Sequence, residues 1–291
     1  MHRKKIVLIL AAACLTLGAQ AREFSGARAM EYARKAVSFG PRPPGSPALR
    51  GLRAYVLAEL KLRGCTVIED SFTASTPLGP IPMVNIIAHF PGKSGRAVVF
   101  TGHYDTKLEP LVRFVGADDG GSSTAFLLEM AEALQGAPRK DDVYLVWFDG
   151  EEALHKEWTD ADSLYGSRHL AERWAADNTL GRIKALINLD MIGDKDLDIM
   201  DEQNSSPALR KLIWSTARQL GYGKYFLDTG GPTDDDHMPF VHMGVEAVDL
   251  IDFDKSYWHT PQDTIDKLSP HSFEVVGTVL TAVLNKLEET Y

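Results

Sequence analysis

Short apolar segments alternate along this chain with segments of helical periodicity, and this alternation constrains the fold more than any other feature. Apolar runs typical of strands buried in a sheet occupy residues 97–101, 143–148 and 183–189, and residues 245–251 are a last predicted strand. Helical patterns lie between them, at residues 121–134, 163–174 and 207–220. Strands that alternate with helices indicate an α/β domain built on a mainly parallel sheet.

The flanking segments extend this architecture. Residues 65–74 and 83–90 alternate like strands, in a sheet expected to be mixed but mainly parallel. Helical patterns occupy residues 27–39, 47–63 and 271–289. A length of 291 residues allows one domain or two. Because no linker or repeat follows residue 46, we expect residues 22–291 to form a single domain with a twisted, mainly parallel central sheet flanked by helices.

The N-terminal residues 1–21 resemble a secretory signal. Arg3, Lys4 and Lys5 precede a short apolar stretch, and Ala19-Gln20-Ala21 is a small-residue cleavage site. The apolar stretch is short of the ~20 residues that cross a bilayer, so a membrane span is not expected. We therefore predict an exported protein, periplasmic or secreted, and rank a lipid-modified Cys14 second.

The net charge limits the kinds of binding partner, and the cysteine content limits what can stabilise the fold. Removal of three cations with the signal would move the formal net charge from −9 to −12, a surface that does not attract nucleic acid. Cys65 would then be the one remaining thiol, so that no internal disulfide is expected. Stability must come from packing and, we infer, from a metal.

Acidic and imidazole side chains cluster where the predicted strands end. The positions are His103 and Asp105, Asp118 and Asp119, Asp149, Glu151 and Glu152, Asp190, and His259. The carboxyl ends of strands in an open α/β sheet border the crevice that binds ligands. Carboxylates gathered there would repel one another unless a cation neutralised them, and mixed carboxylate and imidazole ligands suit catalytic zinc.

Each segment alone has a simpler interpretation. Asp118-Asp119 before a helix is most often an N-cap, and Glu151-Glu152 after a glycine is most often a solvated loop. Coincidence of all these acids at one sheet edge is what favours the metal. The chain has no G-x-S-x-G, P-loop or G-x-G-x-x-G motif, so that serine hydrolase and nucleotide-binding chemistry are unsupported.

Several motifs in order resemble those of the zinc aminopeptidase superfamily. They are Gly102-His103-Tyr104-Asp105, Gly116-Ala117-Asp118-Asp119, Asp149-Gly150-Glu151-Glu152, Asn188-Leu189-Asp190 and Trp258-His259-Thr260. Within that superfamily the segments 162–170 and 235–240, with Trp158, resemble the glutaminyl-peptide cyclotransferases. The resemblance covers nearly all of the chain beyond residue 21 and implies a zinc aminopeptidase-like fold.

The resemblance also implies a set of roles. One zinc ion per chain would be bound by Asp119, Glu152 and His259. Glu151 would be the proton shuttle beside Asp190 and Asp235, while Trp158 and Trp258 would line the glutamine pocket. His103 would support the ligands from behind. The implied substrate is a peptide or protein with an N-terminal glutamine, converted to pyroglutamate with release of ammonia.

Two alternatives stay open. A secreted zinc aminopeptidase is the first, because His103 and Asp190 match the residues that hold a second metal in that branch, so that the ligands alone do not separate one metal from two. A binding protein on an inactive enzyme fold is the second. Trp158 and Trp258 could instead pack in the core. Core packing is what we expect for a third tryptophan, Trp147, which lies within a predicted strand. The sequence does not indicate an oligomeric state.

Overall fold

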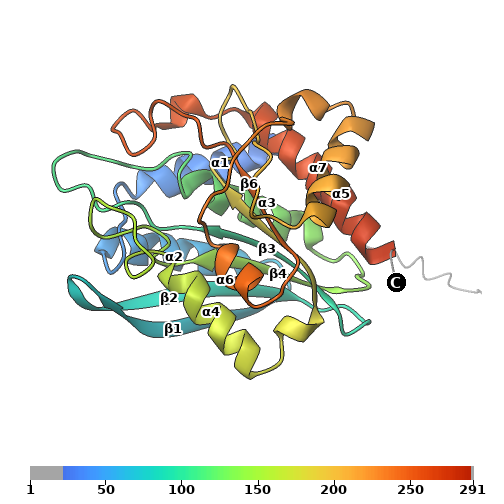
Figure 1. Cartoon of the computed structure of the whole chain (residues 1–291), viewed down its shortest axis with the longest axis horizontal. Coiled ribbons are helices and arrows are strands. Elements are labelled where there is room, and N and C mark those ends of the chain that lie inside the picture. The colour runs from blue at the N-terminus through green and yellow to red at the C-terminus, as the bar shows by residue number, and fades with distance from the viewer. Residues whose placement is uncertain (1–21, 290–291) are drawn as a thin grey trace, which may run out of the picture.

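In the computed structural model, which describes residues 22–289, a six-stranded mixed sheet forms the centre of the molecule (Figure 1). The strand order is β1-β2-β4-β3-β5-β6, where the β1–β2 and β2–β4 pairs are antiparallel and the other pairs are parallel. The strands are β1 (Thr66–Thr76), β2 (Gly79–Phe90), β3 (Ala97–His103), β4 (Asp142–Phe148), β5 (Ile183–Asp190) and β6 (Ala247–Ile251).

Helices cover both faces of the sheet. The sheet therefore divides the apolar core into two layers, one on each face. The helices are α1 (Gly26–Ser38), α2 (Pro47–Leu60), α3 (Gly121–Leu134), α4 (Tyr165–Ala176), α5 (Pro207–Gln219), α6 (Met238–His242) and α7 (Pro270–Glu289), with 3-10 turns η1 (Leu180–Arg182), η2 (Gly223–Tyr225) and η3 (Ile265–Lys267). The larger apolar cluster packs α1, α2, α3, α5 and α7 on one face. A smaller cluster, which includes Trp174 and Phe240, packs α4 and α6 on the other.

The predicted fold class is confirmed. Every expected strand and long helix is present, and Trp147 is fully buried in β4 as expected. The second helix is shorter than the predicted 47–63, because α2 ends at Leu60 and the backbone turns to a left-handed Gly64; Leu62, within the predicted helix, is 63% exposed. The short α6 was not expected, since its five residues are too few to show a helical period.

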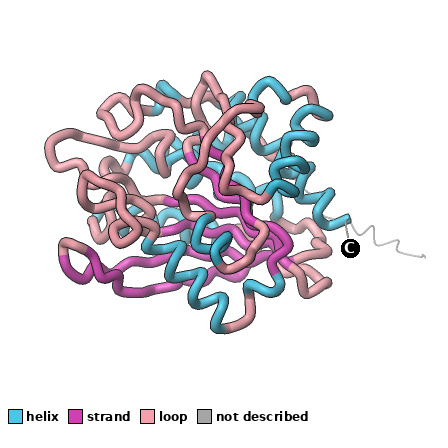
Figure 2. The backbone as a smooth tube through the Cα atoms, in the orientation of Figure 1, coloured by secondary structure: helices cyan, strands magenta, loops and turns pink. Residues whose placement is uncertain are grey.

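The parallel strands bring the predicted site residues to one edge. His103 ends β3 and Asp190 ends β5, while the loops after β4 and β6 start at the same edge. Long loops gather on this side of the strands (Figure 2). The predicted signal at residues 1–21, with Cys14, lies outside the described residues; among those described, no helix is long and apolar enough to cross a membrane.

The contact between β3 and α3 depends on Gly102. A Cβ at this position would lie 2.5 Å from the Cβ of Ser123 and 2.8 Å from the carbonyl oxygen of Leu189. We predict that Gly102→Ala lowers the free energy of unfolding by ~1–3 kcal/mol, because the helix must move away from the sheet. Gly181→Ala is the matched control, since a Cβ there meets nothing within 4 Å. Urea denaturation measures both, and equal stability of the two variants would contradict the close packing.

Candidate metal centre and active site

A buried arginine holds the loop that leads from β3 to α3. The Arg42 guanidinium donates hydrogen bonds to the carbonyl oxygens of Tyr104 (2.9 Å), Val115 (2.5 Å) and Gly116 (2.8 Å). Burial lowers the pKa of Arg42 to about 10, against the opposing effect of Asp119, so that it stays charged at neutral pH. Arg42 belongs to the Pro-Arg-Pro-Pro-Gly run at residues 41–45, which follows the first helix and was not among the predicted site residues.

Asp119 lies at the end of this loop and is not the N-cap of α3. The N-cap residue is Gly120, with φ of 73° and no side-chain capping bond, so the capping interpretation of Asp118-Asp119 was wrong. Instead, the Asp263 carboxylate accepts hydrogen bonds from the amides of Asp118 (2.9 Å) and Asp119 (3.2 Å). The Asp119 side chain is therefore free to face the site.

Asp105 positions the two neighbouring glutamates after β4. Its carboxylate oxygens accept hydrogen bonds from the amides of Glu151 (3.2 Å) and Glu152 (3.4 Å), and Asp105 itself is fully buried. The turn before them needs Gly150, whose φ is 72°. One buried carboxylate thus fixes the backbone of both glutamates.

His259 arrives from the loop after β6 in a strained conformation. Its φ of 52° is left-handed, which is uncommon for a residue with a side chain and is often found at functional sites. The Trp258 ring stacks on its imidazole at 4.0 Å, and Phe114 contacts it edge-on at 5.6 Å. These contacts orient the imidazole so that its Nε2 faces Asp119 and Glu152.

Asp119, Glu152 and His259 form the first candidate metal group. Their ligand atoms all lie within 4.8 Å of one another, and His259 Nε2 is 3.3 Å from Asp119 Oδ2 and 3.1 Å from Glu152 Oε1. Burial, with the charge of Asp119, raises the pKa of Glu152. Burial disfavours the imidazolium of His259, yet Glu152 and Asp119 raise its pKa to about 10. The two carboxylates therefore require a positive charge between them.

Two carboxylate oxygens of this group lack hydrogen bonds from the residues that the structure describes and are suited to bind a metal ion. Asp119 Oδ2 and Glu152 Oε2 are buried and make no hydrogen bond within the described part of the chain. Buried carboxylate oxygens without a hydrogen bond are costly unless a cation coordinates them. Two carboxylates and one imidazole form the donor set of a catalytic zinc site with one open position.

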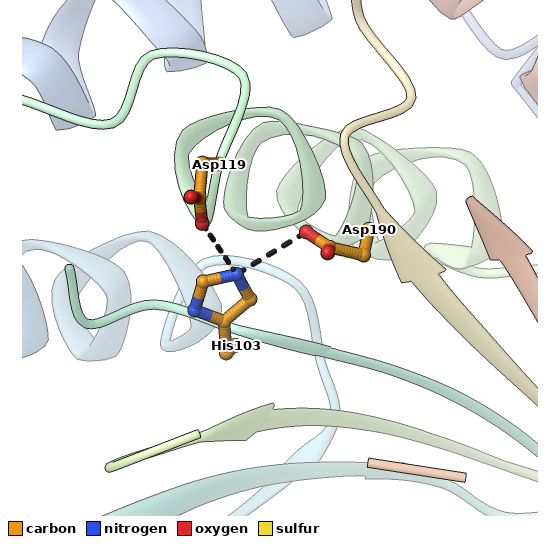
Figure 3. A group of neighbouring side chains, drawn as sticks. All are labelled: His103, Asp119 and Asp190. Carbon is orange, nitrogen blue, oxygen red and sulfur yellow. Dashed lines mark hydrogen bonds and ion pairs between the residues drawn. The ribbon is translucent and has the colours of Figure 1, made fainter. Parts of the chain in front are cut away.

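His103, Asp119 and Asp190 form a second group that shares Asp119 with the first. Figure 3 shows the His103 ring between the two aspartates, with Nε2 3.2 Å from Asp119 Oδ1 and 3.3 Å from Asp190 Oδ1. Burial opposes a proton on His103, but Glu151 and the surrounding aspartates raise its pKa well above the usual value. The single Nε2–H of His103 lies within reach of both aspartates, while Nδ1 faces Asp105 (3.6 Å) and Glu151 (3.7 Å). A second metal could occupy the same group of three residues.

Lys107 is a site residue that the sequence analysis missed. Its side chain is buried, and its Nζ lies 3.9 Å from Glu152 Oε2. The ammonium group balances part of the negative charge around the metal group. A lysine two residues beyond Asp105, in a loop otherwise assigned to ligands, was the available signal.

A pocket of about 330 Å³ opens over these groups. All predicted site residues except His103 line it, together with Pro232, Thr233, Asp234, Ile251 and Phe253. Trp158 is 36% exposed and Trp258 40% exposed, so both border a cavity rather than fill the core. His103 lies beneath, fully buried.

Polar side chains continue behind the pocket, through the strands. Thr101 Oγ1 donates to Asn188 Oδ1 at 2.7 Å, and Asn188 Nδ2 donates to Asp249 Oδ1 at 3.1 Å. These three residues are paired across β3, β5 and β6. Burial raises the pKa values of Asp249 and of Asp235, which lines the pocket. The aspartate within an otherwise apolar strand was the signal that the sequence analysis passed over.

Glu202 joins the loop after β5 to the loop that carries Asp235. Its carboxylate accepts hydrogen bonds from Ser205 Oγ (2.6 Å) and from the amides of Asn204 (2.8 Å) and Thr233 (2.8 Å). His237 Nε2 lies 3.3 Å away, and both residues are fully buried. Burial raises the pKa of Glu202, but His237 and these donors outweigh it and hold the pKa at about 2.

Known proteins match the chain over most of its length. The model of Peptidase family M28 matches residues 85–284. The glutaminyl-peptide cyclotransferase-like protein of Mus musculus is 34% identical over 275 residues, which cover 84% of this chain and 71% of that protein. The glutaminyl-peptide cyclotransferase of Drosophila melanogaster is 32% identical, with 77% of this chain and 70% of that protein covered.

Solved structures of glutaminyl cyclases and of a zinc-dependent exopeptidase share the fold of this chain. An Acidobacteriales bacterium glutaminyl cyclase superposes with a TM-score of 0.89 at 38% identity, covering 94% of this chain and 97% of that one. A Zn-dependent exopeptidase from Parabacteroides distasonis has a TM-score of 0.83 at 27% identity, with coverage of 92% and 99%. The predicted zinc aminopeptidase-like architecture is thereby confirmed.

The contacts of Glu202 predict a pH-dependent effect of Glu202→Gln. The depressed pKa means that the carboxylate contributes stability above an unfolded pKa near ~4.3, and this contribution is lost as pH falls toward about 2. The variant should therefore be ~1–3 kcal/mol less stable at pH 7, with a difference that shrinks below about pH 4. Urea denaturation across this pH range measures it, with the exposed Asp254→Asn as control. A difference independent of pH would refute the role of the charge.

Proposed function

The chain belongs to Peptidase family M28 and, within it, to the glutaminyl-peptide cyclotransferases, and from this membership we propose that it converts the N-terminal glutamine of peptides or proteins into pyroglutamate with release of ammonia. The observation that carries the proposal is the pocket in which a candidate metal group, a buried glutamate outside that group and two exposed tryptophans lie together. The reaction is an intramolecular acyl transfer, so the enzyme is an acyltransferase.

We propose one zinc ion per chain, bound by Asp119, Glu152 and His259. Zinc in this position would act as a Lewis acid toward the γ-carboxamide oxygen of the glutamine. His103 supports the one-metal assignment, because its imidazole already lies within hydrogen-bonding distance of Asp190 and Asp119. It would hold these aspartates from behind without binding metal itself.

Glu151 is proposed as the proton shuttle. The α-amine attacks the γ-carboxamide carbon, so that a C–N bond forms and the bond to the amide nitrogen breaks. Glu151 accepts the proton of the amine and delivers it to the departing nitrogen, which leaves as ammonia. Burial, with the nearby Glu152, raises the pKa of Glu151 against the effect of His103, and the raised pKa favours general acid–base catalysis near neutral pH. Asp190 and Asp235 line the same pocket and would share this proton network.

Trp158 and Trp258 are proposed to confine the glutamine side chain. A flexible side chain must fold back on its own amine, and fixed geometry in such a reaction contributes on the order of 7–11 kcal/mol at best. Both rings border the pocket, and Trp258 stacks on His259. The same rings would exclude water, which is the competing nucleophile.

Zinc-dependent aminopeptidase activity is the second candidate. The His103–Asp119–Asp190 group favours it, because a second metal bound there would give a two-metal centre. In that case Glu151 would activate a water molecule. Ammonia release from a Gln-initiated peptide, compared with release of free leucine from a Leu-initiated peptide, separates the candidates. We expect ammonia alone; free leucine would favour the aminopeptidase, and a zinc-loaded protein inert to both would indicate a binding protein on an inactive fold.

We further propose that the protein is exported, with residues 1–21 as the cleaved signal and Cys14 as the less favoured lipid site. Cell fractionation and the N-terminal sequence of the mature protein test this. A mature chain that begins at or near Arg22 is expected, whereas an uncleaved chain would contradict the proposal.

The adjacent Glu151 and Glu152 should respond differently to the same substitution. Glu152→Gln removes an anionic ligand, so zinc affinity should fall and added zinc should partly restore activity. Glu151→Gln cannot titrate, so the protein should fold, retain zinc and lose ~10²–10⁴ in kcat. Elemental analysis and the ammonia assay provide the two measurements. Full activity of a zinc-loaded Glu151→Gln variant would make Asp190 or Asp235 the next candidate.

Truncation of the two tryptophans should impair turnover more than folding. A buried tryptophan changed to alanine typically costs ~3–5 kcal/mol of stability. Because Trp158 and Trp258 are over a third exposed, each alanine variant should be destabilised by clearly less while kcat/KM for a glutamine peptide falls. Urea denaturation and the ammonia assay on the same samples compare the effects. A variant destabilised as much as a buried tryptophan would show that the residue belongs to the core.

A further inference from the structure

A second cavity adjoins the active-site pocket. Its volume is about 420 Å³, and Trp158 and Asp234 line both cavities. A peptide whose N-terminal glutamine occupies the active-site pocket must continue out of it, because the second residue is attached to the glutamine carbonyl. Because the two cavities share Trp158 and Asp234, the second cavity is adjacent to the point from which such a peptide would continue.

The apolar lining of this cavity comes from α4, α6 and the residues beside them. It consists of Leu164, Met238, Pro239 and Met243. Methionine side chains are flexible and polarisable, and they adapt to ligands of different shape. The cavity can therefore pack the apolar part of more than one kind of side chain.

Three carboxylates line the same cavity. They belong to Asp160, Glu172 and Asp234, all exposed. Within residues 22–289, none of these carboxylates makes a hydrogen bond or an ion pair with another side chain. A cationic ligand could meet them without displacing an internal partner.

The one arginine of the lining is already engaged with the backbone. Arg168 donates hydrogen bonds to the carbonyl oxygens of Asp160 (2.5 Å), Ser163 (2.7 Å) and Leu164 (3.3 Å). These bonds tie the loop that carries Trp158 to α4. The guanidinium is thus directed at the loop, and the acids outnumber it; His242 is the other basic residue of the lining.

We propose that this cavity is a subsite for the residue that follows the glutamine by one or two positions, and that it favours a lysine or arginine side chain there. The proposal rests on the proposed function. The hydrocarbon stem of such a side chain would pack on Leu164 and the two methionines, while its charged end would reach the carboxylates. A glutamate at the same position would be repelled.

The test compares two peptide series and glutaminyl amide, which has no following residue. In one series lysine or glutamate occupies position 2, and in the other position 3. At low salt we expect kcat/KM to favour lysine over glutamate by about three- to ten-fold in at least one series, as for a few exposed charge pairs. The Asp160→Asn/Glu172→Gln double variant should reduce this ratio to below about two-fold, and Met243→Lys should reduce it independently. Neither variant should change turnover of glutaminyl amide.

Glu157→Gln is the matched control, because Glu157 is an exposed acid beside Trp158 that lines neither cavity. It should keep the ratio of the parent protein. Selectivity that is absent, or that survives both variants unchanged, overturns the subsite while turnover of glutaminyl amide upholds the proposed function. Failure to cyclise glutaminyl amide and both peptide series would overturn the two together.

Discussion

Burial of several carboxylates at one edge of the sheet is the constraint on which the site depends. Asp119, Glu151, Glu152, Asp190 and Asp235 line one small pocket, and all are buried. Negative charges this close disfavour one another in a medium of low dielectric constant, and each pKa shifts unless a cation is present. Lys107, His103 and His259 balance part of the charge, while one oxygen of Asp119 and one of Glu152 still lack a hydrogen bond within residues 22–289. A divalent cation is the simplest way to satisfy them.

The backbone around the acids is held by other buried charges. Asp105 binds the amides of Glu151 and Glu152, Asp263 binds the amide of Asp119, and Arg42 binds the carbonyls of the intervening loop. These residues act on the ligands through the main chain. The backbone of the site therefore has fixed hydrogen-bond partners that do not depend on a metal, which suits catalysis by fixed geometry.

The sequence was sufficient to predict the sheet, its flanking helices and the edge at which the acids meet. Apolar strands and strand-end acids are local signals, and the parallel sheet converts them into a common location. It was not sufficient to identify the residues that position the site. Arg42 acts on a loop far along the chain, and Glu202 joins two loops through amides, so neither contact leaves a periodic pattern. N-capping, the simpler alternative for Asp118-Asp119, is excluded because Gly120 is the N-cap of α3, and the amides of both aspartates donate instead to Asp263, which is distant in sequence.

The measurement that tests the central claim most directly is the amount and position of zinc in the purified protein. Elemental analysis together with a crystal structure that uses the anomalous signal of zinc provides both. The account predicts one zinc ion per chain, bound by Asp119, Glu152 and His259, with His103 hydrogen-bonded to Asp190. Two tightly bound zinc ions, with the second on His103 and Asp190, would contradict it, as would a fully active protein without metal.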